Sequence, residues 1–383
     1  MLQDLSWEGG AVEVRGALEL DRTSDGWLPR RLPAWTKPQL PDIFMNTMVT
    51  MTAGVRIVFA TDSPVVEFVS HPRTIHTLPS VVRPPIYQLV VDGEIRPDVV
   101  ATGGSYVHID RTKGPEGIEF EVGAAVTVRW DDLGDHHKTV EIWLPTNSSV
   151  ELLALRVVEG ASVAPVPITR RRWTHYGSSI SHCMDVDRPF DAWPPMVSRL
   201  ANVELADVAL AGQCQLDPFM GRVIRDLPAD VISVKVGINL VNMASMTQRT
   251  FAPAVHGLLD HIRDGHPVTP LLVVSPIVCP VAEDHPGPTV PTAGGTFGVV
   301  ATPPEARLEP LTLRGIRRTL AAIVDQRRAA GDQHLHHLDG LELFGTDDHH
   351  LLYDGLHPSP EGYALLGQRF AQRVFGPGGP FGD

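Results

Sequence analysis

The chain has 383 residues, 43% of them hydrophobic, and a formal net charge of -13 at pH 7. This length is enough for two or three domains that each bury a core. The negative charge argues against binding to nucleic acid or to an anionic membrane surface, because both require clustered Lys and Arg. The three cysteines, Cys183, Cys214 and Cys279, lack metal-site spacing and indicate reduced thiols. With no recognisable signal peptide and no apolar run of membrane-spanning length, we expect a cytoplasmic protein.

The first half of the chain is dominated by short segments in which apolar and polar residues alternate. One of them, residues 87–91, ends in Asp92-Gly93, which is a hairpin signal. Several strands at this spacing, without helical segments between them, predict an all-β, jelly-roll-like antiparallel sandwich over residues 1–165. Such a domain could bind a glycan or a protein partner, or border an active site. Residues 158–167 lose the alternation and gain prolines, so they are expected to form the linker.

The second half, residues 166–383, alternates strand-like runs with segments of helical period. This pattern predicts a parallel sheet with helices on both faces and ligands at the carboxyl ends of the strands. Pro253 is compatible with its helix only if it falls in the first turn. The strand-like runs are 203–211, 230–239, 270–277 and 335–344, and the apolar stripes of the helices lie within 251–262 and 313–324.

Candidate functional residues follow four of the predicted strands. Ser179 follows the first strand, Gly212 the second and Asn239 the third, and Asp354 and His357 lie between the fifth strand and a closing helix. A serine hydroxyl needs a base within hydrogen-bond reach, which His357 can supply while Asp354 orients the imidazole. The backbone N–H groups of Ser179 and Gly212 and the side-chain amide of Asn239 would then stabilise an oxyanion.

The second half resembles the SGNH, or GDSL, family of serine esterases and acyltransferases. Gly177-Ser178-Ser179-Ile180 stands where the family has Gly-Asp-Ser-Leu, and Gly212, Asn239 and the Asp354-x-x-His357 pair match the other motif positions. The resemblance implies a flavodoxin-like three-layer α/β/α domain. It also implies catalytic Ser179, His357 and Asp354, an oxyanion hole of Ser179, Gly212 and Asn239, and no metal or cofactor. Serine at 178, isoleucine at 180 and leucine at 240 depart from the family pattern, so Ser178 stays an alternative nucleophile.

An amino-terminal sandwich followed by Tyr-Gly-Ser-Ser-Ile resembles family members that include carbohydrate esterases and biosynthetic acyltransferases. The resemblance implies an O-acyltransferase of a pathway such as antibiotic biosynthesis. Its partners would be an acyl donor, such as a CoA thioester of an aryl (salicylyl) acid, and a hydroxyl of a small natural product. Two alternatives stay open: a carboxylic-ester hydrolase that deacetylates a carbohydrate, and a non-catalytic glycan- or partner-binding protein. The oligomeric state is not predicted.

Three further features have competing interpretations. A Cys–His hydrolase built on Cys183 would leave Ser179 idle, and His182 beside it could line the pocket. His136-His137 lacks a third metal ligand, which favours a solvated turn. The insertion from Cys279 to Pro304, rich in Pro, Gly and Thr, is either a surface loop or a lid or wall of the acceptor pocket.

Overall fold

The chain forms two compact units in the computed structural model, which describes residues 1–292, 294–300 and 310–382. The first unit comprises Met1–Thr169 and Cys183–Asp191, and the second comprises Arg170–His182 and Ala192–Asp383. The sequence predicted two consecutive domains that meet at residue 165. In the structure the segment Cys183–Asp191, which follows that boundary, belongs to the first unit.

The first unit is built from two sheets of eight and seven strands. Among its described strand pairs, β6 and β10 run parallel and the others run antiparallel. The first sheet contains β1 (Leu2–Asp4), β3 (Glu19–Arg22), β4 (Trp27–Arg30), β6 (Val66–Thr77), β10 (Ser105–Ile109), β11 (Ile118–Glu121), β12 (Val126–Trp130) and β14 (Ser148–Val158). The second contains β2 (Glu13–Arg15), β5 (Arg56–Thr61), β7 (Ile86–Val91), β8 (Glu94–Ile95), β9 (Val99–Val100), β13 (Lys138–Trp143) and β15 (Val163–Ala164), and helix α1 (Ile43–Thr50) also belongs to this unit.

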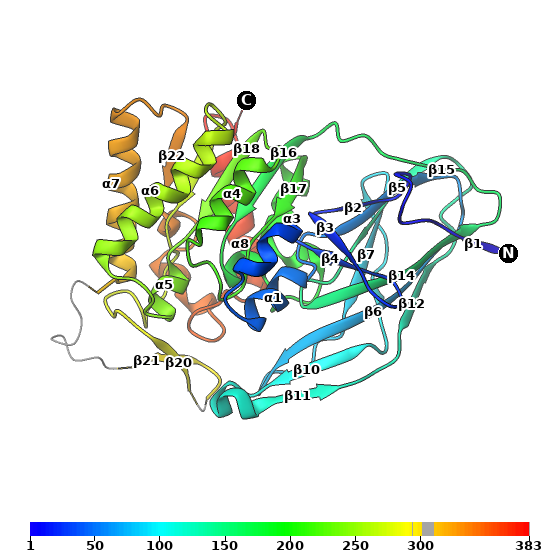
Figure 1. Cartoon of the computed structure of the whole chain (residues 1–383), viewed down its shortest axis with the longest axis horizontal. Helices are drawn as coiled ribbons and strands as arrows, with labels where there is room; N and C mark the ends of the chain where they lie inside the picture. Colours follow the sequence, from blue (N-terminus) through cyan, green and yellow to red (C-terminus); the bar gives the residue numbers. More distant parts are fainter. Residues whose placement is uncertain (293, 301–309, 383) are drawn as a thin grey trace. The chain divides into compact units, whose positions relative to one another are not determined.

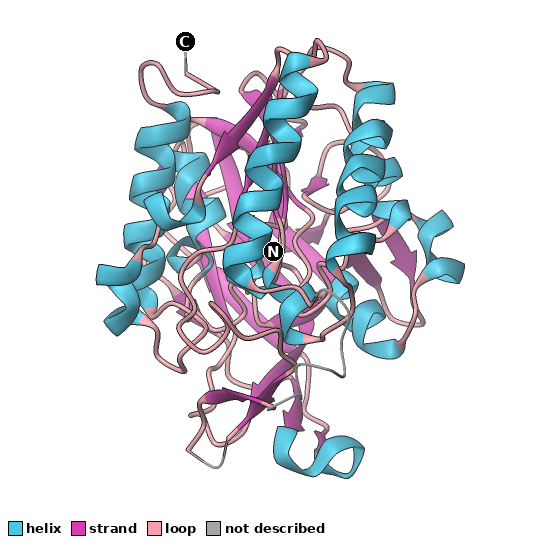
Figure 2. Cartoon of the chain, turned by 90° about the vertical axis from the view of Figure 1, so that its left-hand side faces the viewer, coloured by secondary structure: helices cyan, strands magenta, loops and turns pink. Residues whose placement is uncertain are grey.

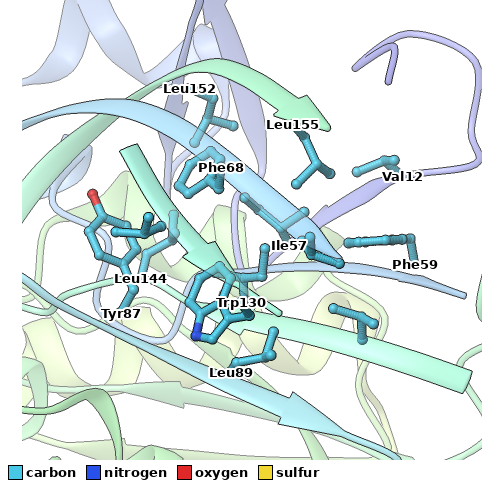
Figure 3. Close-up of a cluster of buried hydrophobic side chains, with 14 of the residues drawn as sticks. Val12, Ile57, Phe59, Phe68, Tyr87, Leu89, Trp130, Leu144, Leu152 and Leu155 are labelled. Atoms are coloured by element: carbon cyan, nitrogen blue, oxygen red, sulfur yellow. The ribbon is translucent and has the colours of Figure 1, made fainter. Parts of the chain in front are cut away.

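A hydrophobic core joins the two sheets of this unit (Figure 3). Phe68 from the first sheet and Tyr87 from the second make an edge-to-face contact with ring centroids 5.7 Å apart. The Tyr87 hydroxyl is paired with Ser70 Oγ at 2.8 Å, so the buried polar group is satisfied. The predicted amino-terminal β-rich domain is therefore confirmed, as is the β7–β8 hairpin at Asp92-Gly93. The predicted linker 158–167 is wrong in one respect, because β15 lies within it and pairs with β5.

The second unit contains a parallel sheet of five strands in the order β17-β16-β18-β19-β22. Its strands are β16 (Arg171–Tyr176), β17 (Val203–Asp207), β18 (Val231–Lys235), β19 (Leu271–Val274) and β22 (Leu335–Leu338). Numbered along the chain this is the order 2-1-3-4-5 of a flavodoxin-like sheet, which confirms the predicted fold class. In such sheets a ligand binds where the strand order reverses, here at the carboxyl ends of β16 and β18.

Helices cover both faces of this sheet (Figure 2). Helices α4, α6 and α7 pack side by side, and α3 packs beside α8. The predicted apolar stripes of α6 and α7 are buried, which explains why these segments fold as helices against the sheet. The α-helices described in this unit are α2 (Ser179–His182), α3 (Trp193–Leu200), α4 (Pro218–Asp226), α5 (Ile238–Asn242), α6 (Gln248–Gly265), α7 (Leu313–Ala329) and α8 (Pro360–Phe370) (Figure 1).

The expectation that Pro253 is compatible with its helix only in the first turn is wrong. Helix α6 begins after its N-cap Thr247, and Pro253 lies six residues beyond that cap, inside the helix. A proline there removes one backbone donor. The buried side chains of Phe251 and Val255 on either side, together with the capping box at Thr247, stabilise the helix in spite of this loss.

The described part of the insertion between β19 and α7 contains a hairpin of β20 (Thr289–Pro291) and β21 (Phe297–Val299). Residues 293 and 301–304 of the predicted 279–304 insertion lie outside the described residues. Within the described part of the chain, we find no helix with the length and apolar character that a bilayer crossing requires.

Candidate active site

Ser179 stands at the start of α2, directly after a sharp turn at the end of β16. The carbonyl of Ser178 accepts the N–H groups of Ser181 and His182 at 3.0 and 2.9 Å, which closes this turn. A Cβ atom at Gly177 would collide with the Ser181 hydroxyl, so glycine is required there. Ser179 Oγ lies 2.9 Å from Nε2 of His357, whereas Ser178 Oγ lies 3.4 Å from the N–H of Ile180. The turn therefore presents the hydroxyl of Ser179, rather than that of Ser178, to the imidazole.

Asp354 holds the other side of the same imidazole. Its Oδ2 lies 2.7 Å from Nδ1 of His357, and its Oδ1 accepts the N–H groups of Leu356 and His357 at 2.9 and 2.7 Å. Burial alone would raise the Asp354 pKa, but the hydrogen bonds and charge of His357, with the Leu356 N–H, hold that pKa below its ordinary value. An ionised carboxylate accepts the Nδ1 proton, which leaves Nε2 able to accept a proton from Ser179.

Gly212 is placed by the chain that continues from β17 along β16. The N–H of Val208 donates to the carbonyl of His175, and the N–H of Leu210 donates to that of Gly177, both at 2.9 Å. The chain then turns at Gly212, whose φ of +71° favours glycine. These contacts carry the Gly212 loop along β16 to the turn at Gly177 that precedes Ser179.

Asn239 lies in the first turn of α5, directly after β18. Its Oδ1 accepts the N–H of Cys214 at 3.1 Å, which links its side chain to the loop that follows Gly212. Gly237 precedes it with a φ of +128°, and a Cβ there would lie 2.8 Å from Ile316 Cγ2 and from Pro276 Cγ. The amide oxygen is thus engaged, and the Nδ2 branch carries the donor protons of this side chain.

Sequence reasoning missed a buried network beneath the Ser179 turn. His175 Nδ1 lies 2.7 Å from Ser233 Oγ, and its Nε2 lies 2.8 Å from Ser181 Oγ. Burial, with a smaller effect of the Lys235 charge, lowers the His175 pKa to about 3, so the ring is neutral at physiological pH. No sequence signal joins these positions, because 175, 181 and 233 lie on different elements of the fold. The network ties α2 to strands β16 and β18.

His182 and the cysteines have structural surroundings. Nδ1 of His182 accepts the N–H of Ala211 at 3.3 Å, so the residue holds the loop that leads into Gly212. Burial raises the pKa of the Cys214 and Cys279 thiols to about 12, and a thiol rather than a thiolate is a poor nucleophile. Cys183 belongs to the first unit, is buried, and its carbonyl accepts the Thr146 hydroxyl at 3.1 Å.

His136 and His137 are adjacent histidines that could suggest a metal site. Among residues 1–292, 294–300 and 310–382, no group of three or more His, Cys, Asp and Glu side chains is arranged to hold a metal ion. His136 is mostly exposed and lies 3.7 Å from Oδ2 of Asp92. The pair at 136 and 137 therefore has no ligand set around it in this part of the chain.

Comparison with known proteins identifies the family of the second unit. Residues 175–365 match the GDSL-like Lipase/Acylhydrolase family, while a search of curated proteins found no match. A salicylyl-acyltransferase, SsfX3, from a tetracycline biosynthetic pathway has a similar structure, with 24% sequence identity and a TM-score of 0.79 over 97% of this chain and 96% of that chain.

Two carbohydrate esterases share the fold at lower identity. A family two carbohydrate esterase from Clostridium thermocellum is 13% identical, with a TM-score of 0.59 over 96% of this chain and 98% of that chain. An acetyl xylan esterase from the rumen bacterium Butyrivibrio proteoclasticus is 11% identical, with a TM-score of 0.53 over 98% and 97%. The matched segment contains Ser179, Gly212, Asn239, Asp354 and His357. Residues 175–365 of this chain therefore form a domain of the GDSL-like lipase/acylhydrolase family.

Proposed function

We propose that the protein is a serine-dependent O-acyltransferase that works through an acyl-enzyme on Ser179. The observation that carries this proposal is the hydrogen-bonded series from Ser179 Oγ to His357 Nε2, at 2.9 Å, and from His357 Nδ1 to Asp354 Oδ2, at 2.7 Å. A nucleophile, a base and a group that orients the base are the parts that acyl transfer to serine requires.

Acylation begins when His357 Nε2 takes the Ser179 hydroxyl proton as Oγ attacks the carbonyl carbon of the donor. Asp354 stabilises the imidazolium that forms. The N–H groups of Ser179 and Gly212 and the Nδ2 group of Asn239 would receive the negative charge that develops on the carbonyl oxygen. When the tetrahedral intermediate collapses, the proton on Nε2 passes to the leaving group, which for a CoA thioester departs as the thiol.

Deacylation repeats these steps with a hydroxyl acceptor. His357 removes the acceptor proton, the acceptor oxygen attacks the acyl carbon, and the bond to Ser179 Oγ breaks as Oγ regains its proton. An alcohol gives an ester, and water gives the free acid. Similarity to a salicylyl-acyltransferase supports transfer, with an aryl acid such as salicylate as the acyl group and a small natural product as the acceptor.

A screen of acyl-CoA thioesters, salicylyl-CoA among them, against candidate alcohols tests this proposal by product mass. We expect an ester product and an acyl-enzyme on Ser179, and both should vanish in Ser179→Ala. Ser178→Ala is the matched control because its hydroxyl lies beside the Ile180 N–H instead. Loss of the acyl-enzyme in Ser178→Ala and its persistence in Ser179→Ala would overturn the assignment of the nucleophile.

Hydrolysis is the second candidate, because family two carbohydrate esterases share the fold of the whole chain. The same three side chains would hydrolyse an acetyl ester if water were the acceptor. Release of acetate from acetylated xylan or acetylated oligosaccharides, with only free acid formed from every thioester and alcohol pair, would favour this function over transfer. Labelling with a fluorophosphonate distinguishes an acyltransferase or an esterase from a non-catalytic binding protein. Intact mass would show whether the label is stoichiometric, and peptide mapping would locate it.

A further inference from the structure

The hairpin β20–β21 lies against two parts of the candidate site. At its base, a Cβ atom at Gly287 would collide with the carbonyl of Val241, so the chain passes against the backbone of α5, the helix that carries Asn239. At its other strand, the N–H of Phe297 donates to the carbonyl of Asp354 at 3.0 Å. The hairpin therefore spans from the Asn239 helix to the Asp354–His357 loop within one unit (Figure 1).

Two aromatic rings flank the imidazole of His357. The ring of Phe297 makes an edge contact with it, with centroids 5.9 Å apart and an interplanar angle of 64°. The ring of Tyr353 stacks near it at 6.2 Å and 24°, and Tyr353 is 50% exposed. Backbone hydrogen bonds hold both residues in place. The N–H of Phe297 donates to the Asp354 carbonyl and the N–H of Tyr353 donates to the His357 carbonyl, both at 3.0 Å. The base of the reaction thus lies beside apolar aromatic surface on two sides.

This placement bears on the second half of the reaction. An acceptor must bring its hydroxyl to His357 Nε2, so the rest of the acceptor molecule lies next to whatever flanks the imidazole. An apolar group of the acceptor that covers these aromatic rings contributes favourable free energy of burial to binding. Water contributes no such burial, and a polyol must lose hydration to occupy the same place.

We infer that Phe297 and Tyr353 form the acceptor side of this site and select alcohols that carry an aromatic or other apolar group next to the hydroxyl, over water and polyols. The inference rests on the proposed acyl-enzyme mechanism and adds the class of acceptor to it. Phe297 acts as a specificity-determining residue, and the hairpin is the wall that holds it.

The test measures how an acyl-enzyme divides between acceptors. With p-nitrophenyl acetate as donor, the p-nitrophenol burst reports acylation. The ratio of ester to free acid reports transfer, measured separately in benzyl alcohol and in glycerol at equal concentrations. In Phe297→Ala we expect the benzyl ester ratio to fall about tenfold, with the burst rate and the glycerol ratio within about twofold of the parent. Phe297→Leu, which keeps an apolar side chain, should retain most of the transfer and guards against a folding defect.

Val290→Ala is the matched control. Val290 lies opposite Gly298 in the hairpin, so its side chain points to the face opposite that of Phe297, and it is 38% exposed. It should leave the benzyl ester ratio unchanged. A ratio unchanged in Phe297→Ala, or a parent enzyme that prefers glycerol to benzyl alcohol, overturns the inference.

Two other outcomes separate the possible failures. A slower burst in Phe297→Ala with an unchanged ratio means that the ring only positions His357, which overturns the specificity role while the proposed mechanism stands. Absence of a burst and of a fluorophosphonate adduct in the parent protein refutes the acyl-enzyme itself, and with it both the proposed function and this inference.

Discussion

Oδ1 of Asn239 accepts a hydrogen bond from the backbone N–H of Cys214 at 3.1 Å. This contact fixes the orientation of the amide, because a flipped amide would place an NH₂ group against an N–H donor. The backbone carbonyl of Asn239 accepts a hydrogen bond from the side-chain NH₂ of Gln215 at 3.2 Å. The side-chain oxygen of Gln215 in turn accepts a hydrogen bond from the hydroxyl of Ser245 at 2.6 Å. The Nδ2 group is thus oriented before substrate binds, which is what electrostatic stabilisation of an oxyanion requires.

Asn239→Asp isolates the donor. The aspartate keeps an acceptor for the Cys214 N–H but replaces the Nδ2 donor with an oxygen. We expect kcat/KM on an activated ester to fall by about 10²- to 10³-fold, as is typical when one oxyanion donor is removed. The thermal midpoint, measured alongside, should change little. A fall smaller than threefold would remove Asn239 from the oxyanion hole.

Asp354→Asn tests the orientation of His357. The amide can still accept the N–H groups of Leu356 and His357 through its oxygen, but it places NH₂ against Nδ1 and so favours the tautomer that carries its proton on Nε2. We expect kcat to fall by about 10⁴-fold, the size of the effect in serine proteases. Steady-state kinetics checks this, with circular dichroism as the control for folding. Near-parent kcat would show that Asp354 only begins the turn before Gly355.

His175→Gln tests the buried network through its pH dependence. The folded protein holds the His175 pKa near 3, against 6.5 for an unperturbed histidine, so between these values the unfolded chain binds the proton and the folded chain does not. This group therefore destabilises the fold as pH falls from about 6.5 towards 3, by up to about 1.4 kcal/mol per pH unit.

Glutamine can still bond Ser181 and Ser233 but does not titrate. Urea unfolding of parent and variant at pH 7, 6, 5 and 4 should show the parent losing stability faster on acidification, at the rate given above. If the free energy of unfolding falls equally with pH in the two proteins, His175 takes up its proton in the folded state and its pKa is not lowered there. If the neutral His175 positions Ser181, and through α2 also Ser179, then His175→Gln should change kcat and leave KM unchanged.

Gly237→Ala tests the backbone before Asn239. The position combines a φ of +128° with a Cβ that would lie 2.8 Å from Ile316 and Pro276, so we expect a loss of about 1–3 kcal/mol in the free energy of unfolding and reduced activity. Gly257→Ala in helix α6 is the control. A Cβ there meets nothing within 4 Å, and the substitution should stabilise the protein by about 0.5–1 kcal/mol. Equal behaviour of the two variants would contradict the strain argument.

The sequence predicted those features that depend on local pattern. The periodicity predicted strands followed by polar residues, and Ser179 and Asn239 do lie just after the ends of β16 and β18. These two strands are neighbours in the sheet, so their ends lie together. The pairing of Ser179 with His357, 178 residues apart, was predicted from their places at the ends of strands, and the resemblance to a family supported it.

Features that depend on packing between distant elements were not predictable. His175 bridges Ser181 and Ser233 only because β18 brings Ser233 beside it. Phe297 lies in an insertion without periodicity, and only the folded hairpin shows that its ring reaches His357. Pro253 in α6 shows the converse, because a local rule against proline was outweighed by burial of the neighbouring apolar side chains.

The return of Cys183–Asp191 to the first unit determines how the protein can be dissected. Phe190 packs on Trp143 with ring centroids 4.8 Å apart, and its N–H donates to the side chain of Gln88 at 2.8 Å. A fragment that starts at Arg170 would keep this nine-residue excursion, from 183 to 191, but lose both anchors, and it would expose the ring of Phe190 three residues before the start of α3. Expression of the α/β unit alone therefore calls for a short polar bridge between His182 and Ala192 in place of the natural segment.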